Sequence, residues 1–456
     1  MKVLFRLIIL TFLTLHWGHS LAKETCYPEF EISKSKISSQ LTEKSEDKSV
    51  FIYFDQSLSM QGYTKDQPGQ NNLYVNVIDD LQQIAENVGS KTYYHSFGKT
   101  IKPIKENKIA QVIKPGFYEC TGAASECNNQ ESKIHLPFKM AKANPDGTYI
   151  VVTDLFLADN QLVGGTLGQL TKPLKSILKK GKSVGIIGVM SSFNGTIFDI
   201  PTREGGTVSY TEAQKRPFYI IIIGDQKEIN QVKKNLEEQH FTNPEDKYKF
   251  SLITSTPVLQ NLNDKKLISE KSIKNISNAD KFKFDYSPEN LAVYKLNTNQ
   301  KRKLNFLINN SDIIVPGSTG VSNFKIKETL WVSQEPKCKN INWKKSKFEQ
   351  LSKWEQNENN LKIQMFKAVS LKKLFRGMRY FYVGEIYAEK PGTLSEETFK
   401  EWSIRPSEAE EFKDGNPVEF KTLNLTKIIK ILNSVANNEF EPTLIASIAL
   451  DFNLTK

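Results

Sequence analysis

The chain has 456 residues, of which 39% are hydrophobic and 11% aromatic, so it is long enough for two or three domains and too apolar to be disordered throughout. Its formal net charge of +11 comes mostly from lysines spread along the sequence, which is typical of a solvated surface. The sequence carries no nucleic-acid-binding motif, so DNA and RNA are not expected partners, whereas association with a membrane surface or cell surface stays open.

The first 22 residues have the features of a secretory signal peptide. Two basic residues precede an apolar run at residues 7–15, and a small residue stands at the end of the segment. The run is too short to span a bilayer comfortably, although an uncleaved membrane anchor is the alternative. We therefore expect cleavage after Ala22 and a mature protein that is secreted or periplasmic, with residues 23–48 as an exposed lead-in.

The four cysteines fit an oxidising compartment outside the cytoplasm. Cys120 and Cys127 lie seven positions apart in a polar stretch, and we predict that they close a short disulfide loop. Cys26 and Cys338 remain, but the sequence alone cannot choose among the three pairings that four cysteines allow. A zinc site is not expected, because no CxxC or HxxxH spacing occurs.

Residues 49–258 alternate between continuous apolar runs and helical stripes. The runs lie at residues 50–54, 92–97, 149–152, 184–190, 218–223 and 250–253, and the stripes at residues 73–88, 167–178 and 229–236. Apolar runs of this kind are typical of strands that helices cover on both faces. The alternation predicts an α/β domain with a doubly wound, mainly parallel, Rossmann-like sheet.

Residues 259–456 follow a different pattern. Short apolar or alternating segments, separated by polar turns, lie at residues 291–296, 304–308, 361–366 and 378–387. This spacing is typical of antiparallel sheets, so we predict one or two β-rich, sandwich-like domains. One helix is expected at residues 425–435, followed by a last strand at residues 443–450.

The candidate site begins where the first predicted strand ends. Asp55, Ser57 and Ser59 follow that strand with single-residue spacers, and Asp154 directly follows the strand expected at residues 148–153. Ligands of open α/β sheets bind beyond the carboxyl ends of the strands, and a hard cation prefers oxygen ligands. The four side chains therefore predict a metal site, with an ordinary helix N-cap as the plainer interpretation of the serine-rich loop.

This arrangement resembles the metal-ion-dependent adhesion site of von Willebrand factor A-like domains, over about residues 49–258. The resemblance implies that Ser57 and Ser59 bind the metal directly, and that Asp55 and Asp154 bind it directly or through water. The metal is expected to be Mg²⁺, with Mn²⁺ or Ca²⁺ as alternatives.

The family usually adds a threonine from a further loop to the metal ligands. Ser132 is our prediction for that position, and Thr121 and Ser125 are rivals on the same loop. Two residues depart from the family pattern: Leu155 stands where the family often has glycine, and Pro137 shortens the helix that follows Ser132.

The function implied by the resemblance is binding without catalysis. A partly neutralised cation with an open coordination position accepts a carboxylate from another protein, so we predict a metal-dependent adhesion or assembly module that a chelator inactivates. One alternative is a metal-dependent hydrolase that uses the same crevice. The other is a module that has lost the metal and binds through surface contacts alone.

Overall fold

The computed structural model describes residues 28, 48–65, 72–119, 128–129, 131–156, 166–198, 207–241, 248–255, 258–259, 284–287, 291–297, 304–309, 313–314, 321–335, 341–347, 352–356, 360–365, 375–391, 396–404, 408 and 421–453. The predicted signal peptide, all four cysteines, Thr121 and Ser125 lie outside the described residues. Among the described helices, none combines the length and the apolar character that crossing a membrane requires.

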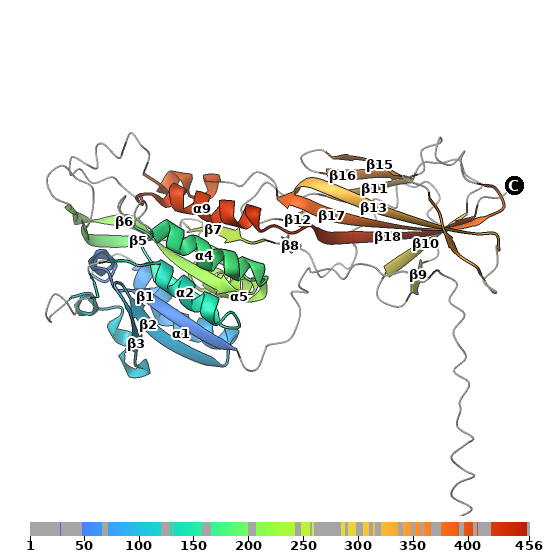
Figure 1. Ribbon diagram of the computed structural model, residues 1–456. Helices are drawn as coiled ribbons and strands as arrows, with labels where there is room; N and C mark the ends of the chain where they lie inside the picture. The colour runs from blue at the N-terminus through green and yellow to red at the C-terminus, as the bar shows by residue number, and fades with distance from the viewer. Residues whose placement is uncertain are drawn as a thin grey trace, which may run out of the picture.

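A seven-stranded sheet lies at the centre of the first half of the chain, with the strand order β3-β2-β1-β4-β6-β5-β7 (Figure 1). Its strands are β1 Ser49–Asp55, β2 Lys91–Phe97, β3 Ile101–Ile104, β4 Thr148–Thr153, β5 Ser183–Phe198, β6 Thr207–Gly224 and β7 Tyr248–Ile253. Every apolar run predicted as a buried strand falls on one of these elements.

The sheet is mixed in strand direction. β1 pairs in parallel with both β2 and β4, which agrees with the predicted parallel arrangement. β3 is antiparallel to β2, β6 is antiparallel to β4, and β5 is antiparallel to both β6 and β7. The direction alternates beyond β4 because β5 and β6 form one long hairpin, whereas parallel neighbours need a crossover connection. The result is a mixed α/β fold that is compatible with a Rossmann-like core.

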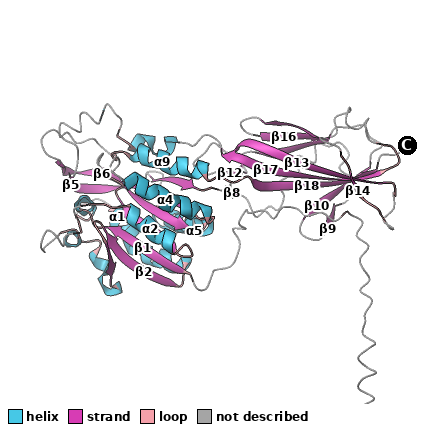
Figure 2. Ribbon diagram, in the orientation of Figure 1, coloured by secondary structure: helices cyan, strands magenta, loops and turns pink. Residues whose placement is uncertain are grey.

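Helices cover both faces of this sheet (Figure 2). α1 Leu73–Val88 and α5 Gln226–His240 share one hydrophobic core, and α2 His135–Ala143 and α4 Thr166–Lys179 share the other. Successive strand residues point to opposite faces, so Ile52 of β1 enters the first core and its neighbour Tyr53 enters the second. This two-sided burial explains why the strands have continuous apolar sequences.

The second core also receives residues from near the end of the chain. The predicted helix is present as α9 Leu425–Asn438, and it packs beside α4, with Leu432 and Val435 in the core. A helix that lies within the predicted β-rich region therefore buries its apolar stripe against the α/β sheet. The sequence showed the apolar residues of this helix but did not show which part of the fold they pack against.

A short helix before α9 contacts the same face. η7 Glu396–Trp402 places Phe399 and Trp402 against β5. Gly188 of β5 allows this close approach, since a β carbon there would lie 2.6 Å from Trp402 Cζ3 and 2.9 Å from Phe399 Cε1. The α/β part of the fold is therefore completed by segments that lie far apart in sequence.

The remaining strands form three smaller sheets, in agreement with the predicted β-rich region. Their orders are β14-β13-β17-β18-β10-β9, β11-β16-β15 and β12-β8, and the pairings are antiparallel except for β10 with β18. The strands are β8 Val258–Leu259, β9 Phe284–Ser287, β10 Leu291–Asn297, β11 Leu304–Asn309, β12 Ile313–Ile314, β13 Val321–Ser333, β14 Lys344–Lys345, β15 Ser352–Gln356, β16 Asn360–Met365, β17 Arg379–Pro391 and β18 Thr443–Asn453.

Candidate metal centre

The two aspartates predicted as ligands lie at the same edge of the large sheet. Asp55 is the last residue of β1, and Asp154 directly follows β4. β1 and β4 are parallel neighbours, with Phe54 opposite Val152, so their carboxyl ends coincide. Asp55 is fully buried and Asp154 is 1% exposed.

Three donors surround the Asp55 carboxylate. Its Oδ1 accepts a hydrogen bond from the backbone N–H of Ser57 at 2.9 Å. Its Oδ2 accepts hydrogen bonds from Ser132 Oγ at 2.6 Å and from Thr153 Oγ1 at 2.7 Å. One backbone donor and two side-chain donors, from three separate segments of the chain, therefore meet at this one carboxylate.

The two serines of the loop lie beside each other. Ser57 is the N-cap of η1 Leu58–Tyr63, but its side chain forms no capping hydrogen bond. Its Oγ lies 3.1 Å from Ser59 Oγ instead. The N-cap interpretation of this loop is therefore not supported for the Ser57 side chain.

Ser132, which we predict as the further ligand, lies next to Asp55, and its role in metal binding stays a prediction. Thr153 is a functional candidate that the sequence analysis missed. The signal was available, because Thr153 is the last residue of the predicted strand and immediately precedes Asp154. Both side chains are buried, with Ser132 8% exposed and Thr153 fully covered.

The backbone at Leu155 adopts a conformation that glycine adopts more easily. It has a φ of 51°, which is in the left-handed region that favours glycine. The turn that begins there is held by two hydrogen bonds, from Leu155 N–H to Thr153 Oγ1 at 3.1 Å and from Phe156 N–H to Asp154 Oδ1 at 3.1 Å. The strained turn fixes the direction in which Asp154 leaves the strand.

Arg216 on β6 is a second residue that the sequence analysis missed. Its Nη2 lies 3.4 Å from Asp154 Oδ2, and both side chains are about 2% exposed or less. The guanidinium carbon lies 4.9 Å from the ring centre of Phe193 and 5.3 Å from that of Phe156, which is a cation–π arrangement. In the sequence, Pro217 alone separates Arg216 from the apolar run at residues 218–223, and this position was the only signal of a buried charge.

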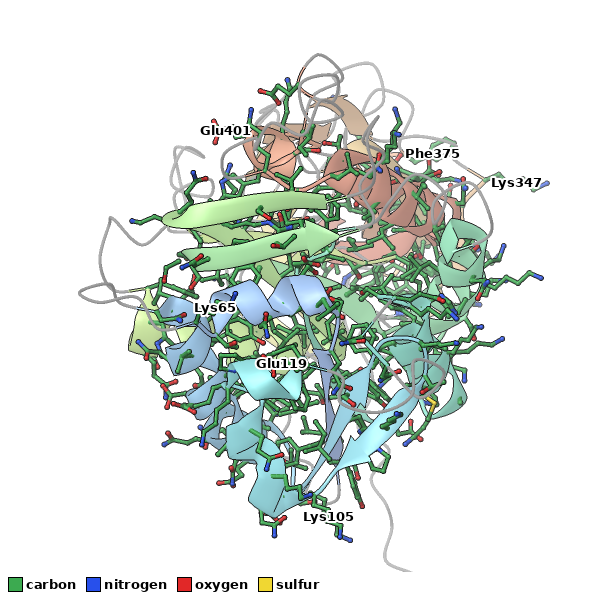
Figure 3. The ribbon with its side chains drawn as sticks, turned by 90° about the vertical axis from the view of Figure 1, so that its left-hand side faces the viewer. Lys65, Lys105, Glu119, Lys347, Phe375 and Glu401 are labelled. Carbon is green, nitrogen blue, oxygen red and sulfur yellow. The ribbon has the colours of Figure 1, made fainter. Side chains whose placement is uncertain are left out.

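The β5–β6 hairpin covers the loop. β4 pairs with β6 only from Tyr219 to Ile223, so the rest of the hairpin extends past the end of β4 and crosses above η1 (Figure 3). Phe193 fits against Gly62, where a β carbon would lie 2.3 Å from its ring, and Tyr63 donates a hydrogen bond to the Pro217 carbonyl at 2.6 Å. Ser57 and Ser59 are consequently only 8% and 9% exposed.

Burial dominates the electrostatics of the site. It raises the pKa of Asp55 to about 6, and the nearby charge of Asp154 acts in the same direction. The hydrogen bonds from Ser132, Thr153 and Ser57 lower that pKa but do not cancel the effect. Arg216 provides one positive charge beside Asp154, and a further cation next to Asp55 would favour the ionised form of that carboxylate.

The residues present fit a hard divalent cation. Adjacent ligands of an octahedral Mg²⁺ lie roughly 3.0 Å apart when each bond is about 2.1 Å. The Ser57–Ser59 oxygen distance of 3.1 Å and the Ser132–Asp55 distance of 2.6 Å are close to that spacing. Asp154 Oδ2 is buried, has no hydrogen-bond partner among the described residues, and lies 3.4 Å from Arg216 Nη2. Among the described residues no group of three or more His, Cys, Asp and Glu gathers at one point, so the oxygen set depends on hydroxyls.

Comparisons of the chain with family models, with curated proteins and with solved structures found no match. The mixed α/β class therefore rests on the strand pairing and helix packing described above.

His135 gives the region next to Ser132 a testable pH dependence. Burial, helped by the charges of Lys139 and Lys133, lowers the pKa of His135 to about 4. The folded protein favours the neutral imidazole, so the unfolded chain takes up a proton first as the pH falls below about 6.5. Stability is therefore lost between about pH 6.5 and pH 4.

We expect the free energy of unfolding of the wild type to fall by about 2 kcal/mol more than that of His135→Asn between pH 7 and pH 4. Urea unfolding at the two pH values measures the difference. Equal losses in both proteins would show that His135 does not carry this pH dependence.

Proposed function

We propose that this chain is a divalent-cation-dependent protein-binding module, with Mg²⁺ as the expected ion. One observation carries the proposal. The Ser132 hydroxyl and the Ser57 backbone N–H both donate hydrogen bonds to the buried Asp55 carboxylate, and the charge of Asp154 lies close to it. Two carboxylates and three hydroxyls are oxygen ligands of the kind that Mg²⁺ prefers. The Asp-x-Ser-x-Ser pattern resembles metal-ion-dependent adhesion sites, and this resemblance is the reason for proposing protein binding as the function of the cation.

Each residue of the site has a separate role in the proposal. Ser57, Ser59 and Ser132 would provide neutral oxygens, while Asp55 and Asp154 would provide the negative charge. When bound, Mg²⁺ supplies a coordination position that accepts a carboxylate from a partner protein. The neutral hydroxyls matter because they leave part of the positive charge for that partner.

The covered site adds a condition to the proposal. The side chains that would hold the cation are at most 9% exposed under the β5–β6 hairpin. A partner carboxylate therefore reaches the cation only when the part of the β5–β6 hairpin that extends past β4 moves away from η1. We also propose a secreted or periplasmic location, which rests on the N-terminal residues and the cysteines alone.

Arg216 favours a second candidate function. Its guanidinium already lies beside Asp154, so the protein has a permanent positive charge at the place where a metal would add one. In this alternative the domain binds a partner through surface contacts and needs no metal. The two candidates differ in a single measurable property, which is the affinity for a divalent cation.

Titration calorimetry of the full, chelator-treated chain with Mg²⁺, Mn²⁺ and Ca²⁺ tests the proposal. We expect one binding site in the wild type and at least about tenfold weaker binding in Asp55→Asn and Ser59→Ala. Asp79→Asn and Ser209→Ala make the same chemical changes at exposed positions and should bind like the wild type.

Two results would contradict the proposal. The first is a wild type that shows no heat of metal binding, which favours the metal-free candidate. The second is equal metal affinity in the wild type and Asp55→Asn, which would place the ion elsewhere. Turnover of chromogenic phosphate or ester substrates that depends on Asp55 would favour the hydrolase alternative instead.

A further inference from the structure

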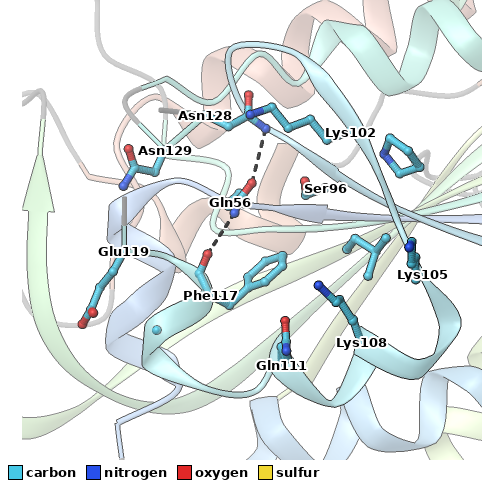
Figure 4. Close-up of a pocket in the computed structure, with 13 residues that line it drawn as sticks. Gln56, Ser96, Lys102, Lys105, Lys108, Gln111, Phe117, Glu119, Asn128 and Asn129 are labelled. Carbon is cyan, nitrogen blue, oxygen red and sulfur yellow. Dashed lines mark hydrogen bonds between the residues drawn. The ribbon is translucent and has the colours of Figure 1, made fainter. Parts of the chain in front are cut away.

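A separate cleft lies on the outer side of the Asp55–Ser59 loop (Figure 4). It has a volume of about 570 Å³, which is within the range of small-molecule sites. Gln56 and Ser96, at the carboxyl ends of β1 and β2, form part of its wall. The cleft therefore lies at the edge of the sheet where α/β proteins bind ligands.

Three lysines line this cleft. Lys102 comes from β3, Lys105 is the N-cap of η2 Glu106–Gln111, and Lys108 lies within η2. Residues three apart in a 3₁₀ helix lie on the same side, which places Lys105 and Lys108 together. Figure 4 shows Lys102 and Lys108 on opposite sides of the same space. The cleft thus concentrates positive charge from two successive elements.

The wall of the cleft is held by its own hydrogen bonds. Gln56 Nε2 donates to the Phe117 carbonyl at 2.9 Å, and Asn128 Nδ2 donates to Gln56 Oε1 at 3.4 Å. Asn128 Oδ1 accepts from the backbone N–H of Thr100 at 2.8 Å. These side chains are fixed before any ligand arrives, which reduces the entropy lost on binding.

One negative charge lies at the far end of the lining. Glu119 is opposite the lysines in Figure 4 and accepts a hydrogen bond from Gln61 Nε2 at 3.0 Å. A ligand with several negative groups would gather them at the lysine end and keep them away from Glu119. The charge pattern therefore favours a multivalent anion in one orientation.

We propose that this cleft binds an anion that carries two or more carboxylate groups. The choice of carboxylates over phosphates rests on the proposed function, in which the partner presents acidic groups at the same edge of the sheet. The site itself needs no metal. Its charges come from Lys102, Lys105 and Lys108, and Glu119 limits how far the acidic groups extend.

Calorimetry of the full chain with citrate, with a hexaglutamate peptide and with pyrophosphate tests the proposal. The protein is first stripped of metal with a chelator and then dialysed into chelator-free buffer, because EDTA itself carries four carboxylates and would compete for the cleft. We expect citrate or hexaglutamate to bind about tenfold more weakly to the Lys102→Gln, Lys105→Gln, Lys108→Gln triple variant than to the wild type. Tighter binding of hexaglutamate identifies a protein segment as the ligand, and tighter binding of citrate identifies a small molecule.

The chain offers a matched control for net charge. Lys139, Lys142 and Lys172 line another hollow, of about 670 Å³, formed by residues of α2 and α4. Their triple replacement by glutamine removes the same charge and should change the affinity by less than about twofold. Glu119→Gln removes a like charge and should strengthen binding by about twofold.

Three results would overturn the proposal. The first is that neither citrate nor hexaglutamate binds to the wild type. The second is that the two triple variants lose affinity equally, which would indicate attraction to the net charge alone. The third is that pyrophosphate binds more tightly than both carboxylate probes. Binding of a carboxylate probe to this metal-free protein, together with a failed Mg²⁺ titration, would uphold this cleft and reject the metal proposal.

Discussion

Replacing Asp55 with alanine is expected to lower the free energy of unfolding by about 4 kcal/mol. The substitution removes the acceptor for Ser57 N–H, Ser132 Oγ and Thr153 Oγ1, and all three donors are buried. A buried donor that loses its partner costs about 1–3 kcal/mol, and the cavity adds to that cost. Urea unfolding in EDTA measures the loss without any contribution from metal.

Asp55→Asn distinguishes the contribution of the hydrogen bonds to stability from the contribution of the charge. The amide keeps the shape of the side chain and one acceptor oxygen. It also removes a carboxylate group that burial makes harder to ionise. We therefore expect a smaller loss than for alanine, about 2 kcal/mol or less. Asp79→Ala, at an exposed position of α1, should change stability by less than about 0.5 kcal/mol. A stable Asp55→Ala protein would show that this carboxylate does not hold the site together.

Replacing Arg216 with methionine is the second change with a large expected effect. Methionine keeps much of the side-chain volume against Phe193 but leaves Asp154 buried without its cation. Breaking a buried ion pair by removing one partner costs about 3–5 kcal/mol, because the remaining charge is uncompensated. We expect a loss of that size in urea unfolding, measured in EDTA.

A double-mutant cycle identifies the cause of that loss. Asp154→Asn combined with Arg216→Met should recover most of the stability, because neither charge is then left alone. Lys215→Met makes the same substitution at the exposed neighbouring position of β6 and should be nearly neutral. Additive losses in the double variant would mean that the two side chains do not interact.

The same variant also distinguishes the two candidate functions. Removing the fixed charge of Arg216 makes the site more negative, so Arg216→Met should bind Mg²⁺ about tenfold more tightly if a cation belongs there. Adding saturating Mg²⁺ should then restore part of the lost stability. No effect of Mg²⁺ on the stability of this variant would favour the metal-free module.

The sequence alone determined the local elements of the α/β part and the components of its site. Continuous apolar runs identified six strands of the large sheet, because two-sided burial leaves no polar alternation. The position of Asp55 and Asp154 after two such runs was enough to expect them at one edge, because β1 and β4 are parallel neighbours. Ser132, which the resemblance suggested as a further ligand, lies within hydrogen-bond distance of Asp55.

Only the tertiary structure decided what surrounds and covers that site. The direction of β6 sets Arg216 beside Asp154, and the length of the β5–β6 hairpin buries Ser57 and Ser59. α9 packs on the α/β sheet although 171 residues, 254–424, separate it from β7. These features depend on pairing and packing between distant segments, and a hydrophobic pattern reports only that a surface is buried, not which partner buries it.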